Sequence, residues 1–266
     1  MRPSIGLKTL YDQRRGLLAW VLGLVGLVAM YAAIWPSIRD QPTFNDYLDE
    51  MPAALRSLFA ASGADMSTPA GYLQVELFSL MAPLLLIGYG ITAGAAAIAG
   101  EEDRRTLELL LANPVSRRRI VLEKLAALTA GMAVLGAGTA LALLAAGPLA
   151  GLSLSLRGIA SATVHLALLG VEFGALALAV GAATGRPGLS RAVPAVVAGL
   201  AYVVNGLAPV VSRLRPVRRF SPFYQYAGHD PLRHGLSWPA VLVTGGSILV
   251  LAALAVTGFR RRDLAA

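Results

Sequence analysis

The chain has 266 residues, of which 56% are hydrophobic and only 14% are charged, and its mean hydropathy is +0.64. An average soluble domain has about 25% charged and 45–50% apolar residues. A single soluble core has no room for this many apolar residues, and this few charged residues cannot cover its surface. The composition excludes a soluble enzyme, a disordered chain and a fibrous protein. It predicts a membrane protein with several spans.

The cysteine content and the net charge exclude further kinds of site and partner. There is no cysteine, which excludes disulfide scaffolds, thiolate zinc sites, iron–sulfur clusters and cysteine nucleophiles. The formal net charge is +8 and the pI is about 10.3, values that would suggest nucleic-acid binding in a soluble protein. In a membrane protein, positive charge instead accumulates in cytoplasmic loops. We therefore expect a lipid environment and no nucleic-acid partner.

Hydropathy places the spans along the chain. About 20 apolar residues in a helix cross a hydrocarbon core of roughly 30 Å. Six segments meet this requirement, at residues 16–35, 73–99, 125–147, 159–184, 192–211 and 238–258. The first is interpreted as a retained span, because its apolar run is longer than the 7–15 residues usual in a signal peptide. Residues 185–191 read as a tight turn. We predict an all-α integral membrane protein with a single transmembrane domain over residues 1–266.

The distribution of basic residues predicts the orientation of the spans. With the N-terminus inside, 15 of the 23 Lys and Arg residues fall in inner segments and eight fall in outer ones. This excess favours an arrangement with both termini in the cytoplasm. The stretch from Ser212 to Ser237 disagrees, because it carries five arginines and is placed outside. Reversing the topology would satisfy this one segment and violate four others.

The first outer loop, from Pro36 to Tyr72, contains an amphipathic stretch. Its apolar residues recur at helical spacing: Phe44, Tyr47, Leu48, Met51, Leu55, Leu58 and Phe59. Pro52 is expected to divide the stretch into two short helices, because proline is tolerated only in the first turn of a helix. We interpret the stretch as an interfacial helix or a cap over the spans, and a substrate-gating role is the alternative.

The inner loop between the second and third spans carries the most specific pattern. It opens with three acidic residues, Glu101 to Asp103, which suit the N-terminus of a helix. Leu107, Leu110 and Leu111 then form a narrow apolar stripe. Pro114 ends the segment. The pattern predicts a short amphipathic helix from Glu101 to Ala112 at the cytoplasmic surface. Such a helix serves either as a passive membrane anchor or as a rigid lever for a cytoplasmic partner.

The same stretch resembles the signature of type-2 ABC transporter permeases. The matching residues are Thr106, Leu107, Glu108, Leu110, Leu111, Pro114, Ser116, Arg117 and Lys124. Arg105 stands where the family usually has glycine, so an altered helix start is expected. Weaker matches to the family are Ser221 to Phe223 in the last outer loop and the tail from Phe259 to Asp263.

The resemblance implies a partner and a role for the inner loop. In this family two permease units form the translocation path, and separate ATP-binding subunits dock beneath them on a coupling helix. Carried over, the ATPase-coupling residues are Glu101, Glu102, Arg104, Arg105, Thr106, Leu107, Glu108, Leu110, Leu111 and Pro114. The implied protein is the permease subunit of an exporter in a bacterial plasma membrane, paired with an identical or related second permease.

No motif predicts catalysis by this chain. The phosphate-binding pattern G-x-x-x-x-G-K-[ST] is absent, as are H-E-x-x-H and G-x-S-x-G. The three histidines are not at metal-ligand spacing with carboxylates. We therefore expect no cofactor or metal on this chain, with ATP and Mg²⁺ held by the partner ATPase.

Four polar residues fall within the predicted spans: Glu76, His165, Glu172 and Asn205. A carboxylate near the bilayer centre must face protein or water. Glu172 therefore serves a substrate cation or a proton relay, or it makes an interhelical hydrogen bond. His165 is expected on the same helix face. The alternative functions are an ion-coupled secondary transporter that uses Glu172, and a membrane scaffold that transports nothing.

Glycine spacing predicts close helix contacts. The pairs Gly90 with Gly94 and Gly181 with Gly185 both have a spacing of four residues, which lets helix backbones approach each other.

Overall fold

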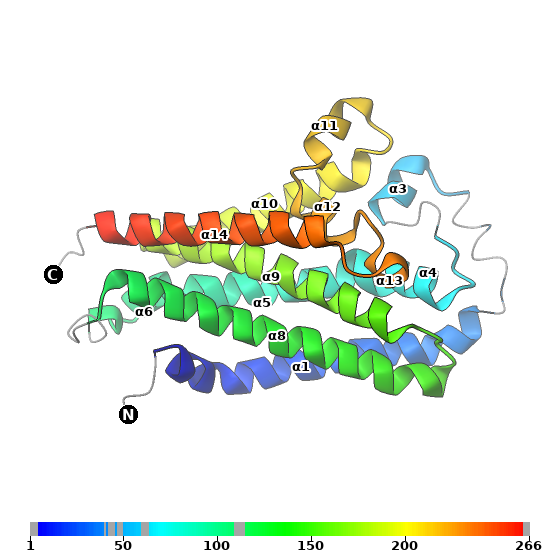
Figure 1. The fold of residues 1–266 in the computed structure, drawn as a ribbon, viewed down its shortest axis with the longest axis horizontal. Coiled ribbons are helices and arrows are strands. Elements are labelled where there is room, and N and C mark those ends of the chain that lie inside the picture. The colour runs from blue at the N-terminus through cyan, green and yellow to red at the C-terminus, as the bar shows by residue number, and fades with distance from the viewer. Residues whose placement is uncertain are drawn as a thin grey trace.

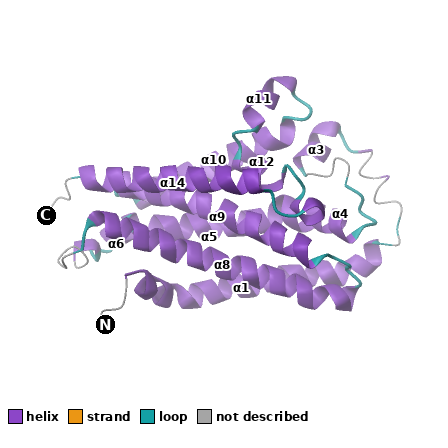
Figure 2. Cartoon of the chain, viewed as in Figure 1, coloured by secondary structure: helices purple, strands orange, loops and turns teal. Residues whose placement is uncertain are grey.

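The computed structural model describes residues 5–39, 41, 46, 50–59, 64–108 and 115–262. Within these residues the fold is helical throughout (Figures 1 and 2). The long helices are α1 (Ile5–Ile38), α5 (Ala82–Ala97), α8 (Arg117–Ala150), α9 (Leu156–Thr184), α10 (Pro187–Leu207) and α14 (Trp238–Arg261). The short ones are α3 (Ala53–Leu58), α4 (Pro69–Leu73), α6 (Ala99–Asp103), η2 (Ser212–Leu214), α11 (Arg215–Arg218), α12 (Pro222–Ala227) and α13 (Pro231–His234). A π-helical segment, η1 (Gln74–Met81), joins α4 to α5.

The prediction of six membrane spans is confirmed. Six helices of the described residues are long and apolar enough to cross a bilayer, and α4, η1 and α5 together make one of them, Pro69–Ala97. Several helices are longer than the apolar segments that predicted them, because a helix continues into polar residues beyond the hydrocarbon. The predicted turn at residues 185–191 is shorter in the structure. Gly185 ends α9 in the left-handed conformation, and Pro187 already starts α10.

Helix α9 lies at the centre of the bundle and packs against α5, α8, α10 and α14 (Figure 1). Both chain ends lie at one end of the bundle, together with α6 and the turn between α9 and α10. Helices α3, α4, α11, α12 and α13 lie at the opposite end. We call the end with the termini the inner end and the other the outer end, following the predicted orientation.

The second span changes its helical geometry where proline enters it. Pro83 stands in the first turn of α5, directly after the π-helical turns that end at Met81. Proline cannot donate a backbone hydrogen bond, and its ring clashes with the carbonyl four residues earlier, here that of Ser79. A π-helical turn is one of the few ways a helix accommodates such a disruption. The span therefore stays continuous through Pro83.

In the first outer loop, α3 begins directly after Pro52, which agrees with the expected helix start at this proline. Most of the amphipathic stretch before it, including Phe44, Tyr47 and Leu48, lies outside the described residues. Helix α3 itself packs against the bundle. Ser57 donates a hydrogen bond to the carbonyl of Gly206, and Tyr202 donates one of 2.8 Å to the carbonyl of Leu58. These contacts favour the interpretation of a cap.

Helices α5 and α9 approach each other through glycines. A Cβ atom added at Gly90 would collide with the carbonyl oxygen of Gly170, and one at Gly94 with that of Gly174. The close helix contact predicted at Gly90 and Gly94 is therefore confirmed as an approach of the α5 backbone to the α9 backbone. At the second predicted pair the roles differ. A Cβ atom on Gly181 would lie 2.9 Å from the Ser190 hydroxyl of α10, whereas Gly185 is the left-handed cap, with φ of 66°.

We predict that Gly94→Val separates α5 from α9 and lowers the free energy of unfolding by about 1–3 kcal/mol, the usual effect of overpacking. Gly26→Val on α1 is the matched control, because a Cβ atom there would meet nothing within 4 Å. Thermal unfolding in detergent measures both variants. An equal loss in the two would show that valine in a helix, rather than the α5–α9 approach, sets the cost.

Candidate functional site

The segment that follows α5 at the inner end is not the single helix that the sequence predicts. A helix from Glu101 to Ala112 was expected, but α6 covers only Ala99–Asp103 and the chain turns at Arg104 and Arg105. Arg105 has φ of 56°, in the left-handed region. The prediction of one continuous helix is therefore wrong at its start. Leu110, Leu111 and Pro114 lie outside the described residues.

The turn after α6 is a Schellman motif, the helix ending that usually requires glycine. The amide of Thr106 donates to the carbonyl of Glu101 at 2.8 Å, and the amide of Arg105 donates to that of Glu102 at 2.9 Å. In this motif the residue after the helix cap adopts the left-handed conformation. Arg105 occupies that position, at which the resemblance stated above leads us to expect glycine. The departure noted in the sequence is thus a point of backbone strain in the fold.

Beyond the turn, polar and apolar side chains of this segment separate. Arg104, Arg105, Thr106 and Glu108 are exposed, whereas Leu107 is only 3% exposed. Leu107 belongs to an apolar cluster at the inner end that includes Ile98, Ile120, Val121 and Phe259. The Leu107 side chain therefore holds the segment to the bundle, and its role in ATPase coupling stays a prediction.

Glu101 is the first of two acidic anchors. Its carboxylate forms an ion pair with Lys124 of α8. The Lys124 side chain is only 4% exposed, and its ammonium also donates a 3.0 Å hydrogen bond to Thr9 of α1. A buried ammonium is costly unless it is paired and hydrogen-bonded. The pair therefore fixes α6 to both α8 and α1.

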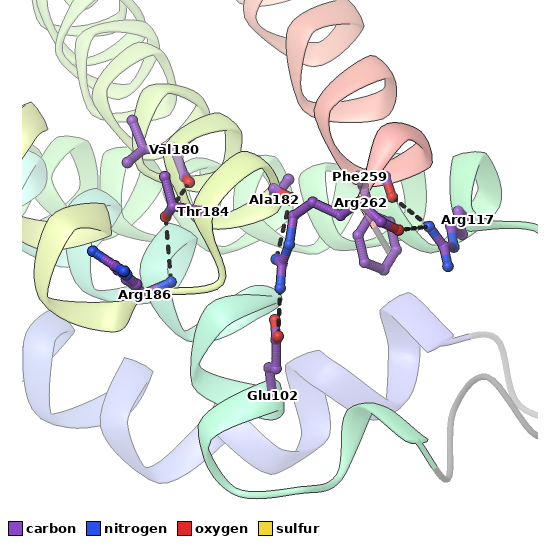
Figure 3. Close-up of polar contacts among 8 residues, drawn as sticks. All are labelled: Glu102, Arg117, Val180, Ala182, Thr184, Arg186, Phe259 and Arg262. Atoms are coloured by element: carbon purple, nitrogen blue, oxygen red, sulfur yellow. Dashed lines mark hydrogen bonds and ion pairs between the residues drawn. The ribbon is translucent and has the colours of Figure 1, made fainter. Parts of the chain in front are cut away.

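Glu102 is the second acidic anchor, and its partner comes from the end of the chain (Figure 3). The guanidinium of Arg262, just after α14, forms an ion pair with Glu102 and donates to the carbonyl of Ala182 in α9 at 3.4 Å. Arg117 at the start of α8 fixes the same tail, because it donates to the carbonyls of Phe259 and Arg262 at 2.8 and 2.7 Å. Phe259 itself is fully buried.

Together these contacts make the inner end a network in which four helices hold one short segment. Sequence reasoning placed Glu101 and Glu102 in the coupling segment, but it did not assign their partners. Five residues of this network were not predicted as site residues: Thr9, Arg117, Lys124, Phe259 and Arg262. The resemblance of the Phe259–Asp263 tail to related permeases was the one signal that could have found the last two.

A cavity of about 380 Å³ opens beside this network between α1 and α5. Its polar end is lined by Thr9, Asp12, Glu101, Arg104 and Lys124. Its apolar end is lined by Leu17, Trp20, Tyr89 and Ala93. Trp20 and Tyr89 meet edge to face, with ring centroids 6.0 Å apart. An arrangement with charge at one end and aromatic rings at the other suits an amphipathic molecule.

Glu172 and His165 share one face of α9, as predicted, and that face meets α14. Ser247 of α14 donates a hydrogen bond of 2.5 Å to Glu172, and the amide of Ser237 donates one of 3.3 Å to Nε2 of His165. The other oxygen of Glu172 is buried without a hydrogen-bond partner among the described residues. The contact with Ser247 supports the interhelical hydrogen bond that was one interpretation of Glu172.

The remaining polar residues do not join Glu172. His165 lies against His229 of the outer loop, with ring centroids 4.5 Å apart. Burial lowers the pKa of His229, which keeps this ring neutral at neutral pH. Asn205 accepts a 3.3 Å hydrogen bond from Arg218, and Glu76 is half-buried in the π-helical segment. The described residues contain no group of three His, Asp or Glu side chains that could hold a metal ion.

Comparison with known proteins gives one family. Residues 4–264 match the model of a family described as ABC-2 family transporter protein. The match spans all six membrane helices and the α6 segment. No individually curated protein shows a significant sequence match to the chain.

We predict that Arg105→Gly raises the free energy of unfolding by about 1 kcal/mol, because glycine adopts the left-handed conformation without the penalty that arginine carries. Arg104→Gly is the control, since Arg104 has an ordinary φ of −84° and should lose stability on the same change. Thermal unfolding, with hydrogen exchange of the amides from Glu101 to Glu108, measures the effect. Equal shifts for both variants would contradict the strain at Arg105.

We predict that Glu101→Ala is more damaging than Glu102→Ala. The first leaves a buried ammonium unpaired, which costs about 3–5 kcal/mol, whereas Arg262 is 19% exposed and is partly hydrated. Adding Lys124→Met to Glu101→Ala removes the unpaired charge and should restore most of the loss. Chemical unfolding of the three variants provides the measurement. Equal losses in the two single variants would mean that the burial of Lys124 does not set the strength of the network.

Proposed function

The chain belongs to the ABC-2 family of transporter proteins, and on this premise we propose that it forms the translocation path of an ABC exporter. We propose further that a separate ATP-binding subunit drives it. A second permease copy, identical or related, completes the path. The protein spans the membrane several times, and we place it in a bacterial plasma membrane. ATP and Mg²⁺ are held by the partner, since no phosphate-binding motif occurs in this sequence.

The observation that carries the proposal is the attachment of the α6 segment to the bundle. The segment presents an exposed ridge, Arg104, Arg105, Thr106 and Glu108, at the inner end. Behind the ridge, Leu107 is buried and Glu101 and Glu102 are paired with basic residues of α8 and of the tail after α14. A load applied to the ridge therefore reaches several spans at once. A loop without such anchors would absorb the displacement locally.

The contacts of the network also support a proposed route for transmitting motion. Glu101 leads through Lys124 to α8 and α1, and Glu102 leads through Arg262 to α9 and α14. We propose that closure of the ATP-binding subunits displaces the ridge and shifts these helices between two arrangements. The cavity between α1 and α5 ends on the same Glu101–Lys124 pair, so movement of the segment reshapes its polar end. We place the cytoplasmic entrance of the path there.

The test is to purify the chain together with any ATP-binding subunit that is encoded beside it. The two should elute as one complex. Glu108→Arg, on the exposed ridge, should reduce the recovered ATPase by about tenfold, because it reverses a charge at the proposed contact. Asp12→Arg makes an equivalent charge change on α1 at the same end and should leave recovery unchanged.

Other outcomes identify the alternatives. Transport that needs no ATPase, follows a pH gradient and is lost in Glu172→Gln would make the chain an ion-coupled carrier. Absence of both transport and ATPase binding would favour a scaffold. Equal loss of ATPase in Glu108→Arg and Asp12→Arg would contradict the ridge as the docking surface. It would not contradict the proposal that the chain forms a complex with an ATPase.

A further inference from the structure

The segment between α10 and α12 projects from the side of the bundle at its outer end (Figure 1). We call residues 209–220 the outer hairpin. It begins just after Leu207, where α10 ends, and contains η2 and α11. Because α10 is apolar and long enough to span a bilayer, the hairpin starts where the hydrocarbon gives way to lipid headgroups.

The outer hairpin combines exposed cations with exposed apolar side chains. It holds four arginines, Arg213, Arg215, Arg218 and Arg219. No acidic residue occurs anywhere between Glu172 and Asp230. Phe220 is 86% exposed, Val217 51% and Val210 48%. The positive charge that contradicted the predicted topology is therefore concentrated on one projecting element.

Two of the arginines hold the hairpin in place. Arg218 donates from Nε to Asn205 of α10 at 3.3 Å and lies over the ring of Tyr224, 5.2 Å from its centroid. Arg215 donates to the carbonyl of Pro209 at 3.3 Å. The hydroxyl of Ser221 fixes the end of the hairpin through a 3.0 Å hydrogen bond to the carbonyl of Ala201. These contacts make the hairpin a defined shape on α10.

The other two arginines face outward. The guanidinium groups of Arg213 and Arg219 make no hydrogen bond or ion pair within the described part of the chain, and both residues are exposed. Arginine beside an exposed aromatic ring is typical of the membrane interface, where guanidinium groups meet phosphates and rings lie just below them. The distribution of charge and apolar surface thus matches a lipid surface with anionic headgroups.

We propose that the outer hairpin binds the phosphate headgroups of anionic phospholipids through Arg213 and Arg219, with Val217 and Phe220 entering the adjoining acyl region. The assignment to the outer leaflet rests on the proposed function, but the lipid contact does not. A second copy of this chain is a poorer occupant. Two copies meeting across a twofold axis would bring their arginine-rich hairpins together without an acidic residue to compensate.

The test uses the absence of cysteine from the chain, which makes a cysteine at the exposed position 212 unique. Ser212→Cys is labelled with a fluorophore in nanodiscs that contain both phosphatidylglycerol and phosphatidylcholine. Either lipid is brominated in turn. Brominated phosphatidylglycerol should quench the label more strongly, and added salt should weaken the preference. Arg213→Gln with Arg219→Gln should lower the preference by about fivefold for each arginine.

Arg260→Gln with Arg261→Gln removes the same charge at the inner end and should leave the preference at position 212 unchanged. Equal quenching by the two lipids would overturn the proposal. Disulfide-linked dimers of Ser212→Cys, with little quenching, would show instead that a second copy covers the hairpin. The readout needs no ATP-binding subunit, so its failure leaves the coupling proposal intact, and loss of ATPase binding leaves the lipid contact intact.

Discussion

The inner end of this bundle is organised by one buried ammonium. Lys124 lies in α8 with its side chain 4% exposed, and a cation there is stable only when paired. Glu101 supplies the counter-charge and Thr9 a further acceptor. Since Glu101 belongs to α6, its ion pair with Lys124 positions the segment that follows the second span. Leu107 is drawn into the apolar cluster behind it, and the exposed ridge follows from that placement. The proposed docking surface is thus a consequence of satisfying one charge.

The second ion pair, between Glu102 and Arg262, restrains the orientation of the segment. A segment held only by Glu101 could pivot about Lys124, because one contact fixes a point and leaves an orientation free. Arg262 adds a contact on Glu102 and links it to the carbonyl end of α9. Arg117 then fixes the tail that carries Arg262 by binding two of its carbonyls. The segment is therefore restrained in orientation as well as position, which is what a part that transmits displacement requires.

Sequence predicts those features that depend on local composition. The six spans follow from length and hydropathy, and the Gly90–Gly94 approach follows from spacing. The break at Arg105 could not be read from helical periodicity, because arginine gives no sign that its backbone is left-handed. Leu107 has the periodicity of a surface stripe, yet it is buried by residues from α5, α8 and α14. The pairing of Glu102 with Arg262 joins residues 160 positions apart, and nothing local in either segment encodes it.

The two ends of the molecule use positive charge in opposite ways. At the inner end, three basic side chains bind carboxylates and carbonyls of neighbouring segments and so hold the helices together: Lys124, Arg117 and Arg262. At the outer end, the stretch from residue 208 to residue 229 contains no carboxylate with which its arginines could pair. The outward-facing guanidinium groups there must find their counter-charge outside the chain, and the apolar residues beside them place that counter-charge at a lipid surface. In this proposal the basic residues of the outer hairpin serve an interaction with lipid, and the prediction of the orientation rests on the other segments.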